Sequence, residues 1–172
     1  HGNVLARVAD GCDEVVKAVR EQVHAGCDLV KIMATGGVMT PGVDPRDANW
    51  TAAEITAGVH EAKRFRRRTA SHAQGTQGIL NAVRAGIDSI EHGIYMDEQC
   101  LEEMLAAGTF LVPTVAAVQN ILRNADSGAS SAGLSTRVQP VARVGQMLHN
   151  WVIRGPFQGM MPPTTPTGSL TV

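Results

Sequence analysis

The sequence predicts an α/β fold in which amphipathic helices alternate with short buried strands. Segments with helical periodicity alternate along the chain with short apolar runs, which is typical of helices packed on a parallel sheet. Three of the predicted helices also end in the same way, in an Ala-Gly pair at residues 25–26, 85–86 and 107–108. Repeated βα units of this kind form either an open doubly wound sheet or a closed barrel.

The elements follow one another in a regular order. Helices are predicted over 13–25, 51–65, 75–85 and 97–107, and strands within the runs 28–37, 68–72, 87–93 and 109–114. Thr51 and Glu54 form a capping-box pattern at the start of one helix, and Asp97 opens another. A closed barrel takes eight strands, typically in about 250 residues, so the chain holds roughly half of one if the fold is a barrel.

Composition excludes several classes of protein. The 172 residues are 44% apolar and 18% charged, enough for one domain with a core. A net charge of −1 argues against a nucleic-acid or membrane-surface role. The sequence contains no run of about 18 apolar residues, so no membrane-spanning segment is expected. The three cysteines are widely spaced without a CxxC pair, which favours a reducing, cytoplasmic location.

The last part of the sequence departs from this pattern. Beyond about residue 128 it contains five of the eight prolines, and no Asp or Glu follows Asp126. A helix over 137–149 is the one element predicted there, and the proline- and threonine-rich ending is predicted to be disordered. We therefore divide the chain into a folded part, 1–126, and an atypical tail, 127–172.

Three side chains at predicted strand ends point to a metal site. Lys31 lies in the first strand, His72 ends the second and His92 ends the third. The carboxyl ends of parallel strands meet at one edge, where such folds bind ligands. A buried lysine must lower its pKa or be modified, and its carbamate could bridge two divalent metals. A single strand-end histidine is more often structural, but two on successive strands beside a lysine favour a metal site, and imidazole is a preferred ligand of zinc.

Other residues are weaker candidates. The Gly36-Gly37 pair lacks a GxGxxG or P-loop pattern and is interpreted as a tight turn that admits substrate near the lysine. Glu91 either orients His92 or pairs with an arginine. His24 and His60 lie on predicted helices and are interpreted as surface residues.

The motifs together are similar to those of a known family. ARVADG, VREQVHAGCDLVKIMATGGVMTPG, SHAQG, AGIDSIEHG and FLVPT resemble the amidohydrolase superfamily, in particular its imidazolonepropionase-like and its prolidase and Xaa-Arg dipeptidase branch, over about residues 1–126. The resemblance implies about strands four to seven of a (β/α)8 TIM barrel with a binuclear zinc site. It implies that Lys31 is the carboxylated strand-four lysine and that His72 and His92 are the strand-five and strand-six ligands. It also implies that Tyr95 contacts substrate.

The sequence also departs from the family pattern. The first-strand HxH pair does not precede His1, and the strand-eight aspartate has no counterpart because no Asp or Glu follows Asp126. These departures suggest the hypothesis of a truncated or partial gene with a frameshift near residue 129. Sequencing the source locus tests this hypothesis, and an uninterrupted native reading frame ending at Val172 would contradict it.

The function that the resemblance implies is metal-dependent hydrolysis of amide or peptide C–N bonds through a metal-activated water. The expected substrates are dipeptides or N-acyl amino acids, with no nucleic-acid or membrane partner. The alternatives are a cyclic amidohydrolase or deaminase, a Schiff-base lyase that uses Lys31, and an inactive half-barrel. With three of about six family ligands, the isolated chain is expected to have little or no activity. Two open sheet edges would favour pairing, so a homo-oligomer is a further expectation.

Overall fold

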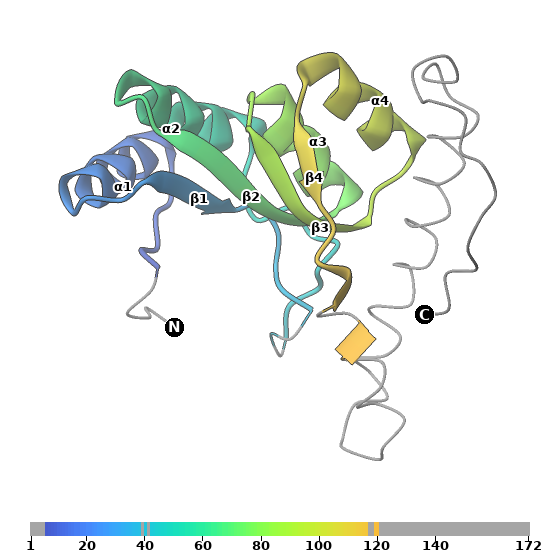
Figure 1. Cartoon of the computed structure of the whole chain (residues 1–172). Helices are drawn as coiled ribbons and strands as arrows, with labels where there is room; N and C mark the ends of the chain where they lie inside the picture. Colours follow the sequence, from blue (N-terminus) through green and yellow to red (C-terminus); the bar gives the residue numbers. More distant parts are fainter. Residues whose placement is uncertain (1–5, 39, 41, 117–118, 121–172) are drawn as a thin grey trace.

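The computed structural model describes residues 6–38, 40, 42–116 and 119–120 (Figure 1). Within them, four helices alternate with four strands, in the predicted order. The elements are α1 Cys12–His24, β1 Leu29–Met33, α2 Ala52–Arg64, β2 Arg68–Gly75, α3 Thr76–Arg84, β3 Ser89–Tyr95, α4 Glu98–Ala107 and β4 Phe110–Val112. The predicted helix 137–149 and the tail 127–172 lie outside the described residues, so both remain predictions.

The four strands form one parallel sheet in the order β1-β2-β3-β4. Side chains alternate along β1: Val30 and Ile32 are buried toward the helices, while Leu29 and Met33 are exposed on the opposite face. Strands that neighbour one another in chain order, with helices on one face, are the arrangement of a barrel segment. A doubly wound sheet carries helices on both faces and reverses its strand order. The structure thus confirms the α/β prediction and favours a partial (β/α)8 barrel among the described residues.

The core lies between the helices and the covered face of the sheet. Ile55 of α2, Ile79 of α3 and Ile90 of β3 are fully buried and belong to one apolar cluster. Fully burying a side chain of this size stabilises the fold by about 1.5–3 kcal/mol. Among the described residues, no helix is long and apolar enough to cross a bilayer.

The predicted helix ends are present. The backbone N–H of Glu54 donates to the Thr51 hydroxyl at 3.3 Å, and the Glu54 carboxylate accepts from the Thr51 N–H at 2.9 Å, which completes the capping box. Asp97 accepts from the Cys100 N–H at 2.9 Å at the start of α4. Gly108 follows α4 with a φ of 70°, in the left-handed region that glycine adopts without strain.

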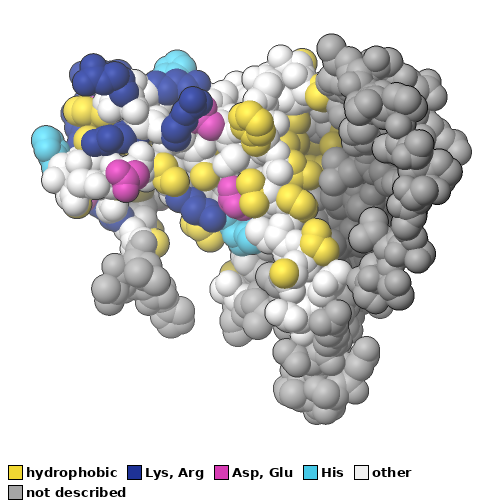
Figure 2. Space-filling model, in the orientation of Figure 1, with side chains coloured by type: hydrophobic (Ala, Val, Ile, Leu, Met, Phe, Trp, Pro, Cys, Tyr) yellow, Lys and Arg dark blue, Asp and Glu magenta, His cyan; other side chains and the backbone are white. Residues whose placement is uncertain are grey.

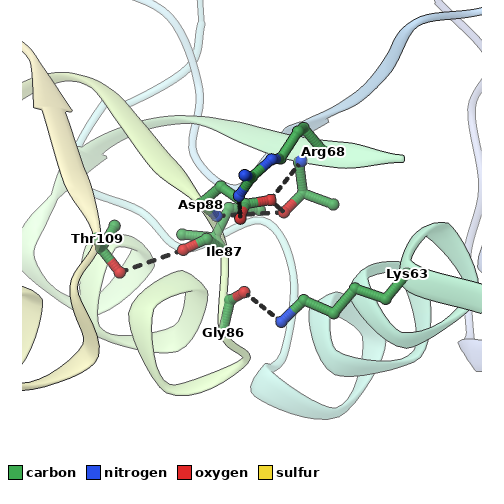
Figure 3. A network of polar contacts seen from close by, with 7 residues as sticks. Lys63, Arg68, Gly86, Ile87, Asp88 and Thr109 are labelled. Carbon is green, nitrogen blue, oxygen red and sulfur yellow. Dashed lines mark hydrogen bonds and ion pairs between the residues drawn. The ribbon is translucent and has the colours of Figure 1, made fainter. Parts of the chain in front are cut away.

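A polar network fixes the register of the strands at their amino-terminal ends (Figure 3). The Asp88 carboxylate accepts from the Thr69 N–H at 2.7 Å and the Thr69 hydroxyl at 2.9 Å, and it pairs with Arg68 at 3.0 Å. Thr109 donates to the Ile87 carbonyl at 3.1 Å. Burial raises the pKa of Asp88, but the hydrogen bonds from Thr69 and the charge of Arg68 outweigh burial and lower it. This edge therefore holds the sheet together and lies opposite the edge where chemistry is expected.

Replacing Asp88 by alanine is expected to lower the free energy of unfolding by about 2 kcal/mol, because the buried Thr69 N–H loses its acceptor. Urea denaturation followed by circular dichroism measures the change. Asp28 precedes β1 as Asp88 precedes β3, but it is exposed and has no hydrogen-bond partner among the described residues. Asp28→Ala is therefore the matched control, with an expected change of less than about 0.5 kcal/mol. Equal losses for the two variants would contradict the role of Asp88.

Candidate metal centre

The structure brings His72 and His92 together at the carboxyl-terminal edge of the sheet. Their ring centroids lie 4.6 Å apart and the rings are nearly perpendicular, at 69°. In the β2–β3 register, however, His72 pairs with Glu91, so simple alternation would turn His92 toward the helices. His92 instead has a φ of 76°, and the register shifts between Ala73 and Gly75. This irregularity explains how the His92 ring comes to lie beside His72.

Each histidine has one ring nitrogen in contact with a protein oxygen. His72 Nε2 lies 3.2 Å from the Gly36 carbonyl oxygen, and because a carbonyl only accepts, Nε2 carries the hydrogen. The lone pair of His72 is therefore on Nδ1. His92 Nδ1 lies 2.7 Å from the Thr114 hydroxyl, which leaves Nε2 without a partner among the described residues. Histidine ligands of metals are typically held in this way by a second partner.

Both imidazoles are neutral at pH 7. Burial lowers the pKa of His72, and the charge of Lys31 lowers it further, against the hydrogen bond to Gly36. Burial, His72 and Lys31 together lower the pKa of His92 from 6.5 to about 4. Since a metal binds the neutral form of imidazole, the pair is in the state that metal binding requires.

The same shifts predict how stability depends on pH. Below pH 6.5, the usual pKa of histidine, the unfolded chain takes up protons before the folded chain does, so the free energy of unfolding falls as pH falls. Above pH 6.5, His92 is neutral in both the folded and the unfolded chain and costs no stability. The loss of stability grows as pH falls from 6.5 toward the folded pKa of about 4. Urea denaturation between about pH 7.5 and about pH 5 measures it. His92→Asn is expected to have a shallower slope, and an equal slope in both proteins would contradict the assignment.

Lys31 shares the open face of the sheet but is not buried, so the burial predicted from its apolar strand is wrong. Within the part of the chain that the structure describes, β1 is an edge strand whose side chains are alternately exposed. The Schiff-base alternative and the argument from burial for a carbamate both lose this support, so the carboxylation of Lys31 rests on the family resemblance. A cavity of about 450 Å³ runs along β1 and includes Lys31 and Trp50 in its lining. Figure 2 shows hydrophobic side chains gathered over β3 and β4 on this face, with charged side chains and histidine among them.

The donor set fits a metal in part. Among the described residues, no three His, Cys, Asp or Glu side chains lie close enough together to hold an ion. His72 and His92 supply two imidazole nitrogens, and Lys31 is near enough for its charge to lower the pKa of both. Glu91 accepts from the Ser89 hydroxyl at 3.0 Å and has no arginine partner in this part of the chain. A third donor from Lys31 would require its conversion to an anionic carbamate.

The other predicted residues surround the histidines. Gly36 and Gly37 lie against His72, where a Cβ on Gly37 would be 3.9 Å from the imidazole Cε1. A Cβ on Gly36 would collide with the Val43 side chain, so the turn is close-packed. The half-buried Tyr95 ends β3, and its carbonyl accepts from the Thr76 hydroxyl at 2.7 Å. His24 and His60 are exposed on α1 and α2, as predicted.

The structure adds residues to which the sequence analysis gave no role. The segment 42–48 is fixed to the sheet by the buried Pro45 and by the Arg46 backbone, which packs on Gly75. Arg46 is exposed, pairs with Asp44 at 2.6 Å, and lies near Tyr95. No sequence motif marks Arg46, because a loop residue acquires its position from packing.

The described residues thus form a segment of a (β/α)8 barrel with two neighbouring histidines at the carboxyl-terminal edge of its strands, where barrels of this kind bind their ligands. The chain belongs to the amidohydrolase family, whose model matches residues 2–145. The family assignment from sequence motifs is therefore confirmed.

Relatives agree with this assignment. Ochratoxinase from Aspergillus niger is 37% identical over 121 residues, or 70% of this chain, and its solved structure superposes with a TM-score of 0.74. A Xaa-Pro dipeptidase with bound methionine is 31% identical with a TM-score of 0.72 over 88% of this chain and 37% of its own. A prolidase complexed with N-methylphosphonate-L-proline is 31% identical with a TM-score of 0.76 over 84% of this chain and 36% of its own. The matched part of the chain spans 25% of the length of ochratoxinase.

Proposed function

We propose that the chain forms the central part of a metal-dependent hydrolase of amide C–N bonds, acting on dipeptides or N-acyl amino acids. The observation that carries the proposal is the pair of neutral imidazoles at the catalytic edge, with ring centroids 4.6 Å apart. Membership of the amidohydrolase family and the dipeptidase and prolidase relatives support the reaction class.

In this proposal, His72, His92 and a carboxylated Lys31 are ligands of zinc. A bound divalent metal supplies a Lewis acid that polarises the amide carbonyl and lowers the pKa of water. The Gly36 carbonyl fixes the His72 ring at 3.2 Å, and Thr114 fixes the His92 ring at 2.7 Å. Both contacts hold the imidazoles ready before metal arrives, which reduces the cost of ordering them.

We further propose that Arg46 receives the free carboxylate of the substrate. The ligands in two relatives, methionine and a proline derivative, are amino acids or derive from one, and a free carboxylate is the group they would share. Arg46 is a guanidinium held by Asp44 at 2.6 Å on a segment packed against Gly75, and its side chain is 68% exposed. A planar guanidinium can donate two parallel hydrogen bonds to a carboxylate, whereas lysine acts as a point charge.

The proposed reaction is tested by incubating the zinc-loaded chain with N-acyl amino acids and measuring released amino acids by mass spectrometry. A slow release of amino acids is expected, because the chain contains three of about six family ligands. A chelator is expected to abolish this release, because the proposed reaction depends on the metal. Release that continues undiminished after zinc has been removed would contradict the metal-dependent reaction.

Arg46 is tested by binding, which does not require turnover. Titration of the zinc-loaded chain with N-acetyl-L-methionine and with its carboxamide, followed by NMR, is expected to show about tenfold tighter binding of the free acid. Arg46→Gln should remove this preference. Arg84 makes a similar ion pair with Glu103 at 2.6 Å on α3, so Arg84→Gln is the matched control and should keep the preference. Equal affinities of the unsubstituted chain for acid and amide would contradict the role of Arg46.

A further inference from the structure

Gln74 is a buried amide next to the histidine pair. It lies two residues after His72 on β2, and only 2% of its surface is exposed. Its backbone N–H donates to the Thr35 hydroxyl at 3.0 Å. A buried amide loses its hydrogen bonds to water, so its oxygen and nitrogen both need partners inside the protein.

The contacts of Gln74 with His72 conflict as they stand. The Gln74 amide nitrogen lies 3.4 Å from His72 Nε2, and the Gln74 amide oxygen is buried without a hydrogen-bond partner. His72 Nε2 carries a hydrogen because it faces the Gly36 carbonyl at 3.2 Å. Two donors therefore face each other, while a buried acceptor remains unsatisfied.

Rotation of the amide by half a turn about its last bond resolves the conflict, since it exchanges oxygen and nitrogen without moving the rest of the side chain. The Gln74 amide oxygen has no partner among the described residues in its present place, so the contact with His72 decides the orientation. We propose that the Gln74 amide oxygen accepts from His72 Nε2–H, shared with the Gly36 carbonyl, and that Gln74 is a positioning residue that keeps the His72 lone pair on Nδ1.

The consequence for the metal rests on the proposed function, but the hydrogen bond itself does not. A shared N–H between two acceptors holds the imidazole in one tautomer and one orientation. Removing such a partner of a histidine ligand typically lowers metal affinity by about 10–100-fold. Gln74 would therefore act on the metal only through His72.

The test measures the tautomer of His72 directly. In the metal-free 172-residue chain labelled with nitrogen-15 in its histidines, long-range proton–nitrogen correlation spectra distinguish Nε2–H from Nδ1–H, and His72→Asn assigns the signals. Gln74→Met removes the acceptor at similar size, and Gln74→Glu keeps an acceptor oxygen. We expect the Nε2–H tautomer of His72 to predominate in the unsubstituted chain and in Gln74→Glu. In Gln74→Met, the ratio of the Nε2–H to the Nδ1–H tautomer should fall at least threefold.

Zinc affinity measured by chelator competition gives a second readout, with about a tenfold loss in Gln74→Met and recovery in Gln74→Glu. An Nδ1–H tautomer in the unsubstituted chain, or an unchanged tautomer ratio in Gln74→Met, would overturn the proposal. If Gln74→Met does not fold, a loss of the Nε2–H signal in Gln74→Glu overturns it equally. Failure to bind zinc or to hydrolyse amides would count against the proposed function and leave the tautomer result standing.

Discussion

Replacing both His72 and His92 by asparagine is expected to lower the zinc affinity of the chain by more than about 100-fold, beyond the 10–100-fold loss typical of outer-sphere partners. The two imidazoles are the nitrogen donors that the structure places together, with centroids 4.6 Å apart. Asparagine keeps the polarity of the positions but supplies no imidazole nitrogen. Competition with a chromophoric chelator measures the affinity.

The matched control uses two other histidines of the same chain. His24 and His60 are exposed on α1 and α2, so the double replacement His24→Asn, His60→Asn removes two imidazoles away from the sheet edge. This control is expected to bind zinc as the unsubstituted chain does. Equal losses in the two double variants would mean that zinc binds histidine without regard to the fold, which contradicts a built metal centre.

Replacing Gly75 by alanine is expected to lower the free energy of unfolding by about 2 kcal/mol and to displace the segment that carries Arg46. A Cβ on Gly75 would collide with the backbone of Arg46, including its Cα and carbonyl carbon. A clash with backbone cannot be relieved by rotating a side chain, so either β2 or the segment must move. Urea denaturation measures the loss of stability.

Gly37→Ala is the matched control for this steric argument. The nearest atom to its Cβ would be the Thr40 hydroxyl oxygen at 3.3 Å, at the end of a side chain that can rotate. The expected change is within about 0.5 kcal/mol. An equal and small effect of both substitutions would show that the segment 42–48 is not packed on β2 as described.

Local sequence patterns predicted the fold because they act within a few residues. The capping box of Thr51 and Glu54 begins α2, and the left-handed Gly108 ends α4, where the patterns indicated. The second strand was predicted too short, at 68–72, whereas β2 extends to Gly75. Its last residues, Ala73, Gln74 and Gly75, owe their extended form in part to pairing with β3, which a local pattern does not contain.

The candidate site was predictable only in its residue types. The motif order indicated Lys31, His72 and His92, and the structure places the two histidines together. The burial of Lys31 was predicted wrongly, because an apolar run does not reveal that its strand lies at a sheet edge. The irregular backbone of His92 and the contact between Gln74 and His72 arise from packing between β2, β3 and the segment after β1.

The predictions about zinc affinity depend on the proposed roles of the ligands. The structure places His72 and His92 together at a site where burial lowers the pKa of both, and the family establishes the kind of barrel they occupy. The identity of the bound metal and the carboxylation of Lys31 follow from the proposal and are open to direct measurement.

The X-ray absorption spectrum of the zinc-loaded chain at the zinc edge tests the central claim most directly, because it reports the atoms bound to the metal. The account predicts the multiple-scattering pattern of two imidazoles at a zinc–nitrogen distance of about 2.0–2.1 Å. That pattern should disappear in the His72→Asn, His92→Asn variant and persist in the His24→Asn, His60→Asn variant. A zinc spectrum without imidazole, or one that the first variant leaves unchanged, would contradict the metal centre.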